Sequence, residues 1–487
     1  MYLREVLMKS KIGKIVLFLL CLVLLLFILS EILKYKSNDG IDQMRAFYTN
    51  ADNTIDVLFM GSSHAYSNIN TGVLYRDFGI AGFDLGGAEQ LLWNNYAWLV
   101  EALKTQRPKV VVLEIFSTGV IKDDFQGAWL MENLYGMKLS ENYFETVKKS
   151  TLDTAFDSYI LPFTRYHSRY TEITEADFKY EEYLKTFKGF EPKWGTQTDT
   201  ELIAPDIGNV TEMTPISEKA ERYYRKYIEL CAQEDIPLLI ICSPYQVTED
   251  AQKIYNYMFS IAEEHGVPYL DFNKMYAELG LNFPADMCEW SHLNEKGNVK
   301  YAAYLGNYLK EHYEIPDRRG DKAYVTWQQD ADRWTQEWNQ HILPGVKDAG
   351  EYIKKLNNPH YTLIIIINEN NDFSLLSEPV KQALATIGID ESALGKKTIV
   401  VKDGRILFQS DKEEYEWYTS FKKGDIIINR EVAEKDGNTE IKNKVLINGA
   451  EYDPTQSPLV IITYDHLLNT RIGTAGLTPE DGYSTIR

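Results

Sequence analysis

The chain is poor in cysteine and in positive charge, and both shortages limit what it can do. Only four of its 487 residues are cysteines. Cys21 lies in a long apolar run, three thiols cannot all pair, and Cys242 in PLLIICSPY is typical of a buried strand thiol, so we expect neither a disulfide framework nor a metal site. The formal net charge of -20 argues against a nucleic-acid partner, because phosphate binding needs a basic surface. There is no glycine-rich nucleotide loop, and we expect no cofactor.

One long apolar run stands near the N-terminus. Residues 15–29 are uninterrupted apolar residues, and with Ile12 the run reaches the roughly 20 residues that cross a bilayer. No small-residue cleavage pattern follows it, which favours an uncleaved anchor over a signal peptide. Basic residues precede it, which predicts a cytoplasmic N-terminus and an extracytoplasmic chain from about residue 36 onward: Arg4, Lys9, Lys11 and Lys14. We therefore expect a single-pass protein of the cell membrane, with stub and anchor at residues 1–35.

Residues 50–315 alternate short apolar runs with stretches of helical periodicity. Fully apolar runs such as KVVVLEIF are typical of parallel strands buried on both faces. The alternation predicts a doubly wound α/β domain with a parallel sheet, and a ligand site at the carboxyl ends of its strands. The expected strands are 55–63, 83–87, 109–116, 236–245 and 267–272. The expected helices are 94–106, 218–235 and 248–264.

Residues 120–215 interrupt this alternation and are rich in aromatic and charged residues. We expect a largely helical insertion. It is either a lid or acceptor groove, with Arg165 and His167 as its inward polar groups, or a structural embellishment.

A second domain is expected after Pro316. Residues 316–358 are predicted to be a helical linker, and 359–487 a β-rich domain of α+β character. Its expected strands are 361–370, 397–410, 444–453 and 458–466, and its single expected helix is 377–388.

The apolar run VLFM ends in Gly61, Ser62, Ser63 and His64, which raises the question of a nucleophilic serine. A serine hydroxyl is a weak nucleophile unless a base accepts its proton and an acid orients that base. His292 follows the last predicted strand, and Glu289 lies three residues before it. These residues form a candidate serine, histidine and acid constellation; a helix-capping serine is the alternative.

Two further polar residues adjoin this constellation. Glu114 ends a predicted buried strand, where an unpaired carboxylate is costly, so it either contacts substrate, orients the serine turn or forms a structural ion pair. His64 is next to Ser63 in the chain, and adjacent side chains diverge, so a direct role for it is not expected.

Three sequence blocks resemble those of the SGNH/GDSL hydrolase superfamily: GSS at 61–63, LGGAEQ at 85–90 and EWSHLN at 289–294. More narrowly, GSSHA, RPKVVVLE and SPY resemble the membrane-anchored branch related to the D-alanine transfer protein of teichoic acid and to polysaccharide O-acetylation proteins. The resemblance spans about residues 50–315. It implies Ser63 as nucleophile, His292 as base and Glu289 as the orienting acid.

The chain departs from that family pattern in two places. The acid is a glutamate where the family usually has aspartate, and Asp286 is a rival for the role. The third family block, Gly-x-Asn-Asp, is missing, because STGV follows KVVVLEIF. Backbone N–H groups of Ser63 and of Gly86 or Gly87 are the remaining oxyanion donors. The missing amide has three candidate replacements, which are otherwise helix caps: Gln90, Asn94 and Asn95.

The resemblance implies extracytoplasmic acyl transfer, such as O-acetylation, to a surface polysaccharide or other glycan, with a multispanning membrane acyltransferase as the partner that supplies the acyl group. An esterase or deacetylase of acylated glycans uses the same residues, and a non-catalytic envelope scaffold is the third alternative. Residues 361–389 and 445–465 resemble the interleukin-like inducer (ILEI) module. That likeness implies a binding or spacing role, with an inert structural domain as the alternative.

Overall fold

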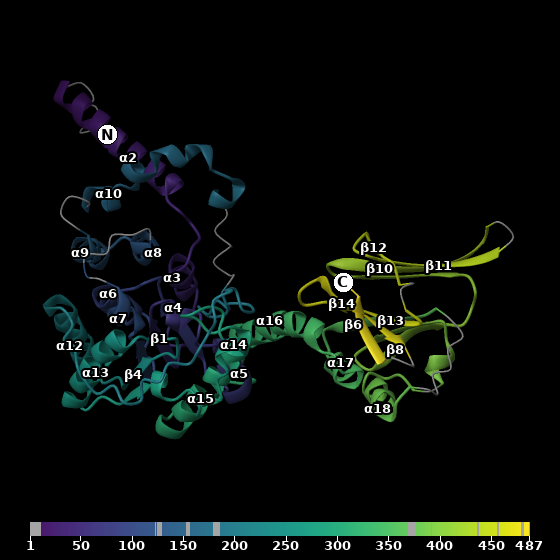
Figure 1. The fold of residues 1–487 in the computed structure, drawn as a ribbon. Coiled ribbons are helices and arrows are strands. Elements are labelled where there is room, and N and C mark those ends of the chain that lie inside the picture. The colour runs from purple at the N-terminus through teal and green to yellow at the C-terminus, as the bar shows by residue number, and fades with distance from the viewer. Residues whose placement is uncertain are drawn as a thin grey trace. The chain divides into compact units, whose positions relative to one another are not determined.

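The computed structural model forms two compact units, Met1–Asp332 and Arg333–Arg487 (Figure 1). It describes residues 11–121, 123, 129–151, 156–178, 186–368, 376–390, 392–435, 438–454, 457–478 and 482–486. The boundary lies inside helix α16 (Val325–Ile342), so the predicted linker is divided between the units. The first turn of α16 belongs to the first unit, because the Trp327 indole N–H donates to the Gly82 carbonyl oxygen at 2.9 Å.

The first unit contains a five-stranded sheet in which every strand pair is parallel, as the apolar runs predict. The strand order is β2-β1-β3-β4-β5. This order reverses direction between β1 and β3, which is where open α/β sheets bind ligands at their carboxyl edge. The strands are β1 (Val57–Gly61), β2 (Gly82–Gly86), β3 (Val110–Glu114), β4 (Leu238–Cys242) and β5 (Tyr269–Asp271).

Helices lie on both faces of this sheet. Met60 of β1 accepts a hydrogen bond from Tyr227 of α12 at 3.1 Å, whereas the neighbouring Phe59 points to the face where Thr71 of α5 packs. Successive strand residues face opposite ways, so α12 and α5 cover opposite faces. The main helices around the sheet are α5 (Thr71–Phe78), α6 (Leu92–Ala102), α12 (Glu218–Gln233), α13 (Glu249–Glu264) and α15 (Glu295–His312).

The insertion is helical only in its first half. Its helical elements are α7 (Phe116–Val120), α8 (Trp129–Tyr135), α9 (Glu141–Ser150), α10 (Phe156–Ile160), α11 (Pro162–Tyr166), η1 (His167–Thr171) and η2 (Glu175–Phe178). Residues 186–216, all described, contain a single β-bridge between Phe187 and Phe190 and no helix. Proline and glycine recur through EPKWGTQTDTELIAPDIGNVTEMTP, and these residues break helices. Parts of the predicted insertion, 122, 124–128, 152–155 and 179–185, lie outside the described residues.

Before the sheet, the chain forms α2 (Lys11–Leu33) and α3 (Ile41–Phe47). Residues 12–33 of α2 are long and apolar enough to span a membrane, a property that a signal sequence shares. Their apolar side chains up to Ile28 are mostly exposed to solvent in the isolated chain.

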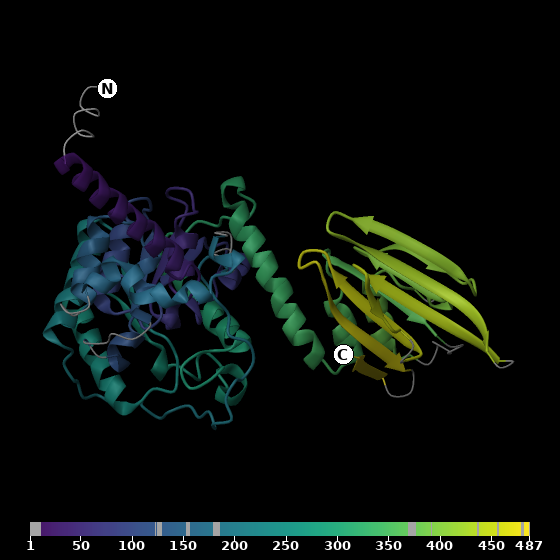
Figure 2. The ribbon, with the colours of Figure 1, turned by 90° about the horizontal axis from the view of Figure 1, so that it is seen from above.

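The second unit has two antiparallel sheets, ordered β12-β11-β10-β9 and β15-β14-β13-β6-β7-β8 (Figure 2). Ile365 of β6 (Tyr361–Ile367) packs against helices α17 (Ala349–Lys355) and α18 (Glu378–Thr386), whereas Ile364 packs against the four-stranded sheet. The six-stranded sheet is therefore covered on both faces, which explains the unbroken apolar sequence of β6.

The remaining strands of the second unit are β7 (Thr398–Lys402), β8 (Arg405–Ser410), β9 (Tyr415–Phe421), β10 (Gly424–Lys435), β11 (Asn438–Ile447), β12 (Ala450–Tyr452), β13 (Leu459–Asp465), β14 (Thr470–Thr478) and β15 (Gly482–Ile486). The apolar runs of the sequence predict β6, β7, β8, β12 and β13 and the end of β11, but not β9, β10, β14 or β15.

Candidate active site

The turn after β1 presents Ser63 at the carboxyl edge of the sheet. Ser63 is the first residue of the short helix α4 (Ser63–Tyr66), and Ser62 caps that helix, its hydroxyl accepting from the His64 N–H at 3.4 Å. Gly61 has φ of 153°, and a Cβ there would lie 2.7 Å from the Cβ of Glu114. Only glycine fits this sharp change from strand to helix. The capping interpretation therefore applies to Ser62 and leaves the Ser63 side chain available.

The loop after α14 (Phe283–Asp286) brings His292 to this serine. Met287 and Leu293 form an isolated antiparallel bridge, and the Cys288 N–H donates to the His292 carbonyl oxygen at 2.8 Å. This tight loop holds His292 Nε2 2.8 Å from Ser63 Oγ. The structure thus joins two residues that are 229 positions apart in the chain.

Glu289 completes the constellation, because its Oε1 forms a short hydrogen bond with His292 Nδ1. The same carboxylate accepts from the His292 and Ser291 backbone N–H groups at 3.0 and 2.9 Å. Burial opposes ionisation of Glu289, but the hydrogen bonds and charge of His292, with help from Ser291, outweigh it and hold the pKa of this carboxyl below its ordinary value. An ionised Glu289 is suited to orient His292 and to stabilise its protonated form.

Sequence reasoning missed Ser291, whose hydroxyl lies 3.0 Å from Glu289 Oε1 and 2.9 Å from His292 Nδ1. Its only sequence signal is its place inside the acid-x-x-histidine block. Asp286, the rival acid, binds elsewhere: its Oδ2 accepts from Lys300 Nζ at 2.6 Å and from the Asn282 N–H at 2.7 Å. The geometry thus gives the contact with His292 to Glu289.

Glu114 lies beneath the serine turn and is almost fully buried. Its carboxylate accepts from the Phe116 N–H at 3.0 Å, the Ser243 N–H at 3.3 Å and the Ser62 hydroxyl at 3.4 Å. Burial raises the pKa of Glu114 to about 8, despite these hydrogen bonds. Glu114 therefore links the ends of β1, β3 and β4. Among the alternatives, this position fits orientation of the turn, not an ion pair or a contact with substrate.

His64 is fully buried behind the site. Its ring stacks on Phe116 with centroids 3.4 Å apart and lies 4.9 Å from the His292 ring. Neither ring nitrogen has a hydrogen-bond partner among the described residues. Burial, and to a smaller extent the neighbouring His292, lower the pKa of His64 well below its ordinary value. The His64 imidazole is therefore neutral and packs beside His292.

The oxyanion candidates lie at the end of β2, next to the serine turn. A Cβ on Gly86 would be 2.8 Å from the Ser62 carbonyl oxygen, and one on Gly87 would be 2.4 Å from Asn133 Oδ1. Gly86 requires glycine because the carbonyl oxygens of Gly61 and Ser62 lie so close, whereas the neighbours of Gly87 are the side-chain atoms of Asn133 and Gln90. Gln90 is fully buried, and neither polar atom of its amide has a partner within the described part of the chain.

Asn133 of α8 was also missed by sequence reasoning, and nothing in its flanking sequence marks it. Its amide donates to the Ala88 carbonyl oxygen at 2.8 Å and so ties the insertion to the loop that carries Gln90. Asn95 donates to the Gln90 carbonyl oxygen at 3.3 Å, and α6 has Leu91 as its N-cap with no side-chain hydrogen bond, so Asn95 does not cap the helix. Asn94 donates to Ser150 at 3.0 Å and so faces α9, away from the serine turn.

Arg165 and His167 are placed by the structure on the insertion beside α2. The Arg165 guanidinium stacks on Tyr159, 4.5 Å from the ring centroid, and the His167 Nδ1 lies 3.4 Å from the Thr164 carbonyl oxygen. None of these contacts leads to Ser63, so the expectation of two inward polar groups on a lid has no support in this arrangement.

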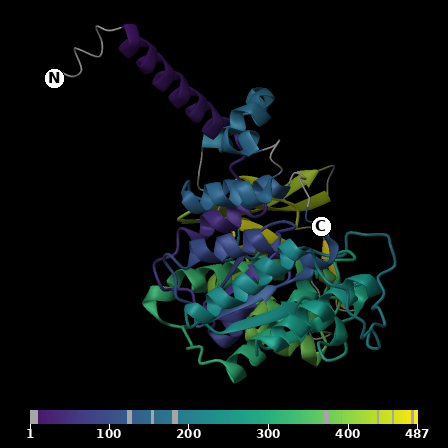
Figure 3. The ribbon, with the colours of Figure 1, turned by 90° about the vertical axis from the view of Figure 1, so that its left-hand side faces the viewer.

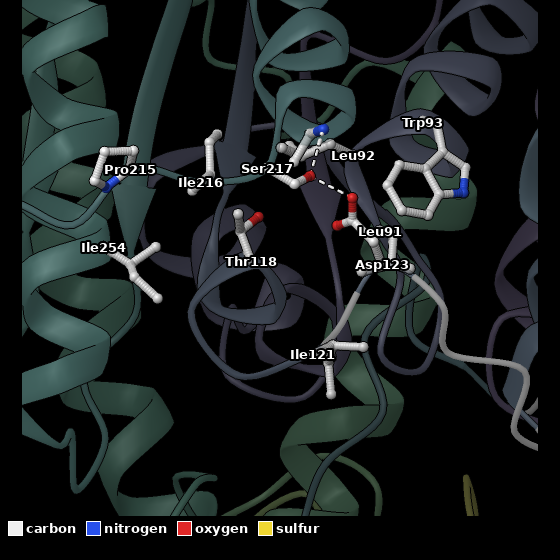
Figure 4. Close-up of a pocket in the computed structure, with 11 residues that line it drawn as sticks. Leu91, Leu92, Trp93, Thr118, Ile121, Asp123, Pro215, Ile216, Ser217 and Ile254 are labelled. Atoms are coloured by element: carbon white, nitrogen blue, oxygen red, sulfur yellow. Dashed lines mark hydrogen bonds between the residues drawn. The ribbon is translucent and has the colours of Figure 1, made fainter.

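A separate apolar cavity of about 290 Å³ lies between α6, α7, α12 and α13 (Figure 4). Figure 4 shows Trp93, Ile121 and Ile254 around it, and Ser217 donating to Asp123 at its rim. Neither Ser63 nor His292 lines it. No group of three or more His, Cys, Asp and Glu side chains in the described ranges is arranged to hold a metal ion.

The geometry of Ser63, His292 and Glu289 is suited to activation of a serine nucleophile. His292 is placed to take the proton of Ser63, and Glu289 to stabilise the charge that results, as in serine nucleophiles generally. Comparison with known proteins adds no family to this description, because no family model and no curated protein sequence matches the chain.

Proposed function

We propose that the protein is a membrane-anchored enzyme that transfers an acyl group to a surface glycan through Ser63. The supporting observation is the hydrogen bond of 2.8 Å between Ser63 Oγ and His292 Nε2, with Glu289 on the opposite ring nitrogen. His292 takes the serine proton as Ser63 attacks the acyl carbonyl, and it returns that proton to the leaving group. It then deprotonates a sugar hydroxyl, which attacks the acyl ester and regenerates Ser63.

The oxyanion of each tetrahedral intermediate needs donors beside Ser63. The Ser63 N–H lies at the start of α4, and the backbone of Gly86 lies next to the same turn, with Gly87 following it in the chain. The amide of Gln90, which has no partner among the described residues, is the candidate for a third donor in place of the missing family asparagine. Removing one such donor typically costs 10²–10³-fold in rate.

A glycan acceptor is supported by the exposed indole of Trp290. This side chain is 49% exposed although it lies between Glu289 and His292 in the loop. Its ring is 6.4 Å from Phe116 and 6.2 Å from Tyr245, which fixes its orientation beside the site. A large exposed aromatic surface beside a reacting centre suits the apolar face of a sugar ring.

The acyl donor and the location follow from α2. A single apolar helix cannot carry an activated acyl group across a membrane, so a multispanning acyltransferase would supply it to Ser63. With the N-terminus in the cytoplasm, the glycan acceptor would lie at the outer surface.

An esterase of acylated glycans is the second candidate. The His292 and Glu289 side chains are 18% and 28% exposed, so water can reach the base as well as a sugar can. Exclusion of water is what separates transfer from hydrolysis at a shared acyl-enzyme. A non-catalytic scaffold is the remaining alternative, and it predicts an unreactive Ser63.

The test uses the full chain in lipid nanodiscs, because the end of α2 is part of the folded unit. Turnover of p-nitrophenyl acetate is measured for wild type, Ser63→Ala and His292→Ala, with and without oligosaccharide acceptors. We expect loss of turnover in both variants, and acyl groups on the sugar with wild type. Acyl release only to water would select the esterase. Equal inertness of all three proteins, with no labelling of Ser63 by a fluorophosphonate, would select the scaffold.

A further inference from the structure

The helix α2 and the first half of the insertion are joined at the end of the apolar span. Figures 1 and 3 show the helices α10 and α11 beside the C-terminal end of α2. The Phe163 N–H donates to Ser30 Oγ at 3.0 Å, and Arg169 donates to the carbonyl oxygens of Leu33 and Lys34 at 3.0 and 3.3 Å. We call residues 139–151 and 156–171 the collar.

The end of α2 is therefore built into the folded unit. Ile28 is 46% exposed, whereas Ser30 and Leu33 are 2% and 4% exposed. The chain remains buried beyond the helix, at Lys36 and Ile41. A segment with these contacts is not a flexible tether. It also fits an anchor that is retained, because cleavage after α2 would remove the collar's binding partners.

The length of α2 sets the depth of the collar. A hydrocarbon layer of about 30 Å takes about 20 helical residues at 1.5 Å each, so a span that begins at Ile12 ends near Glu31. Phe27 precedes that level by one helical turn, yet it lines one small pocket together with Leu139, Tyr143 and Ile160 of the collar. Collar side chains thus reach the level at which hydrocarbon gives way to headgroups.

The collar exposes large apolar and aromatic side chains among its polar residues. Leu139, Phe144 and Tyr170 are 51%, 45% and 70% exposed. Tyrosines surround the end of α2 as well: the Tyr35 and Tyr166 rings are 5.5 Å apart, and Arg169 lies over Tyr35. Tyrosine is enriched at this depth because its ring is apolar and its hydroxyl is polar. At the end of an apolar span, exposed side chains of this kind suit a surface that contacts the lipid interface.

We propose that the collar lies in the interfacial layer of the leaflet at the C-terminal end of α2 and contacts its phospholipids directly through Leu139, Phe144 and Tyr170. The first unit is then fixed at one height on the membrane, in reach of substrates held near the bilayer. This inference rests on α2 spanning the membrane and is independent of the chemistry of Ser63.

The test measures the lipid exposure of nitroxide labels on the full chain in phosphatidylcholine nanodiscs. Labels are attached to Leu139→Cys, Phe144→Cys and Tyr170→Cys in a Cys21→Ser background, where the other three cysteines are buried. Tyr269→Cys is the matched control, an aromatic that is 41% exposed. Tyr269 lies on β5, which is one edge strand of the sheet. The other edge strand, β2, is the one that packs against α3, the helix that follows α2 in the chain, so Tyr269 is at the edge away from α2. A label on the native Cys21 reports whether α2 is inserted.

We expect the ratio of oxygen to aqueous nickel-chelate accessibility to be severalfold higher at the three collar positions than at Tyr269→Cys, and highest at Cys21. Collar labels with the aqueous ratio of the control, beside a lipid-exposed Cys21, would refute the collar and leave the anchor intact. An aqueous Cys21 would refute the insertion of α2 and the collar together. Neither result bears on the reactivity of Ser63, which is measured separately by fluorophosphonate labelling.

Discussion

The strands β1 and β6 are alike in burial and apolar sequence, but the chain that follows each strand is different. Both are fully buried apolar runs, VLFMG and YTLIIII, although β1 is in a parallel sheet and β6 in an antiparallel one. After β1, a helix starts at once and presents Ser63 to His292. After β6, Asn368 donates to the carbonyl oxygens of Pro454 and Ser457, which closes a loop. A buried strand therefore says little about function, and the polar residues that follow it say much.

The sharpest way to break this comparison is to remove the reacting pair after β1. Ser63→Ala and His292→Ala should each lower esterase turnover by roughly 10³-fold or more, because neither nucleophile nor base can be replaced by a neighbour. Both side chains are small or partly exposed, so the unfolding temperature should change little. Turnover of p-nitrophenyl acetate and a thermal scan measure the two effects.

The double variant separates a catalytic unit from two independent effects. Ser63→Ala combined with His292→Ala should be no worse than either single change, because the two residues act on one proton transfer. If the fold-loss of turnover in the double variant equalled the product of the two single losses, His292 would support catalysis by another route.

The choice of acid gives the next largest effect. Glu289→Gln should lower turnover by about 10²–10⁴-fold, since an amide neither holds the charge of His292 nor fixes its tautomer. Asp286→Asn should leave turnover within a few-fold of wild type and instead lower stability modestly, because it weakens the pair of the buried Asp286 with the part-exposed Lys300 and the bond from the Asn282 N–H. The reverse pattern would assign the acid role to Asp286. Turnover and thermal unfolding of the two variants are compared side by side.

The other half of the comparison concerns β6. Ile365→Ala should destabilise the second unit by about 2–5 kcal/mol, since the residue is fully buried against α17 and α18. Ile406→Ala on β8 is the matched control, because Ile406 is 39% exposed. Hydrogen exchange of residues 361–367 reports the difference, and esterase turnover should be unchanged in both variants. A loss of turnover in Ile365→Ala would show that the second unit acts on the site.

Much of the first unit could be predicted from the sequence because its signals are local. Apolar runs and helical periodicity gave all five parallel strands within a few residues, and the order of three short blocks predicted that Ser63, His292 and Glu289 would meet. Residues whose role depends on tertiary packing left no such signal. Ser291, Asn133 and the position of Gln90 depend on how loops approach one another. Arg165, an expected inward group only if the insertion formed a lid or acceptor groove, packs on Tyr159.

The antiparallel strands of the second unit were harder to predict for a physical reason. β9 alternates between exposed and half-buried residues, so it lacks the continuous apolar run that marked β6 and β13. Its partner β10 pairs with it from Gly424 to Arg430, where a run of only three isoleucines stands between Asp425 and Arg430. Edge and two-sided strands are specified by pairing, which the sequence does not display.

The smallest expected effect tests whether Glu114 supports the serine turn as a neutral acid. Its pKa is raised to about 8 in the folded protein, whereas the unfolded chain releases the proton near 4.5. Between these values the folded state holds a proton that the unfolded state has lost. Stability from this group is therefore present below about pH 4.5 and lost as the pH rises toward 8, with a slope of at most about 1.4 kcal/mol per pH unit.

Glu114→Gln keeps the shape and the acceptor oxygen but removes the titration. The wild type should thus lose more stability than Glu114→Gln between pH 5.5 and 8, measured by urea unfolding in nanodiscs, while the exposed control Glu229→Gln should follow the wild type. Turnover of Glu114→Gln at pH 6 should stay near that of wild type, because a glutamine resembles the protonated acid. If the free energy of unfolding changed in parallel with pH in all three proteins, Glu114 would be ionised in the folded state. The serine turn after β1 would then be held by a buried carboxylate.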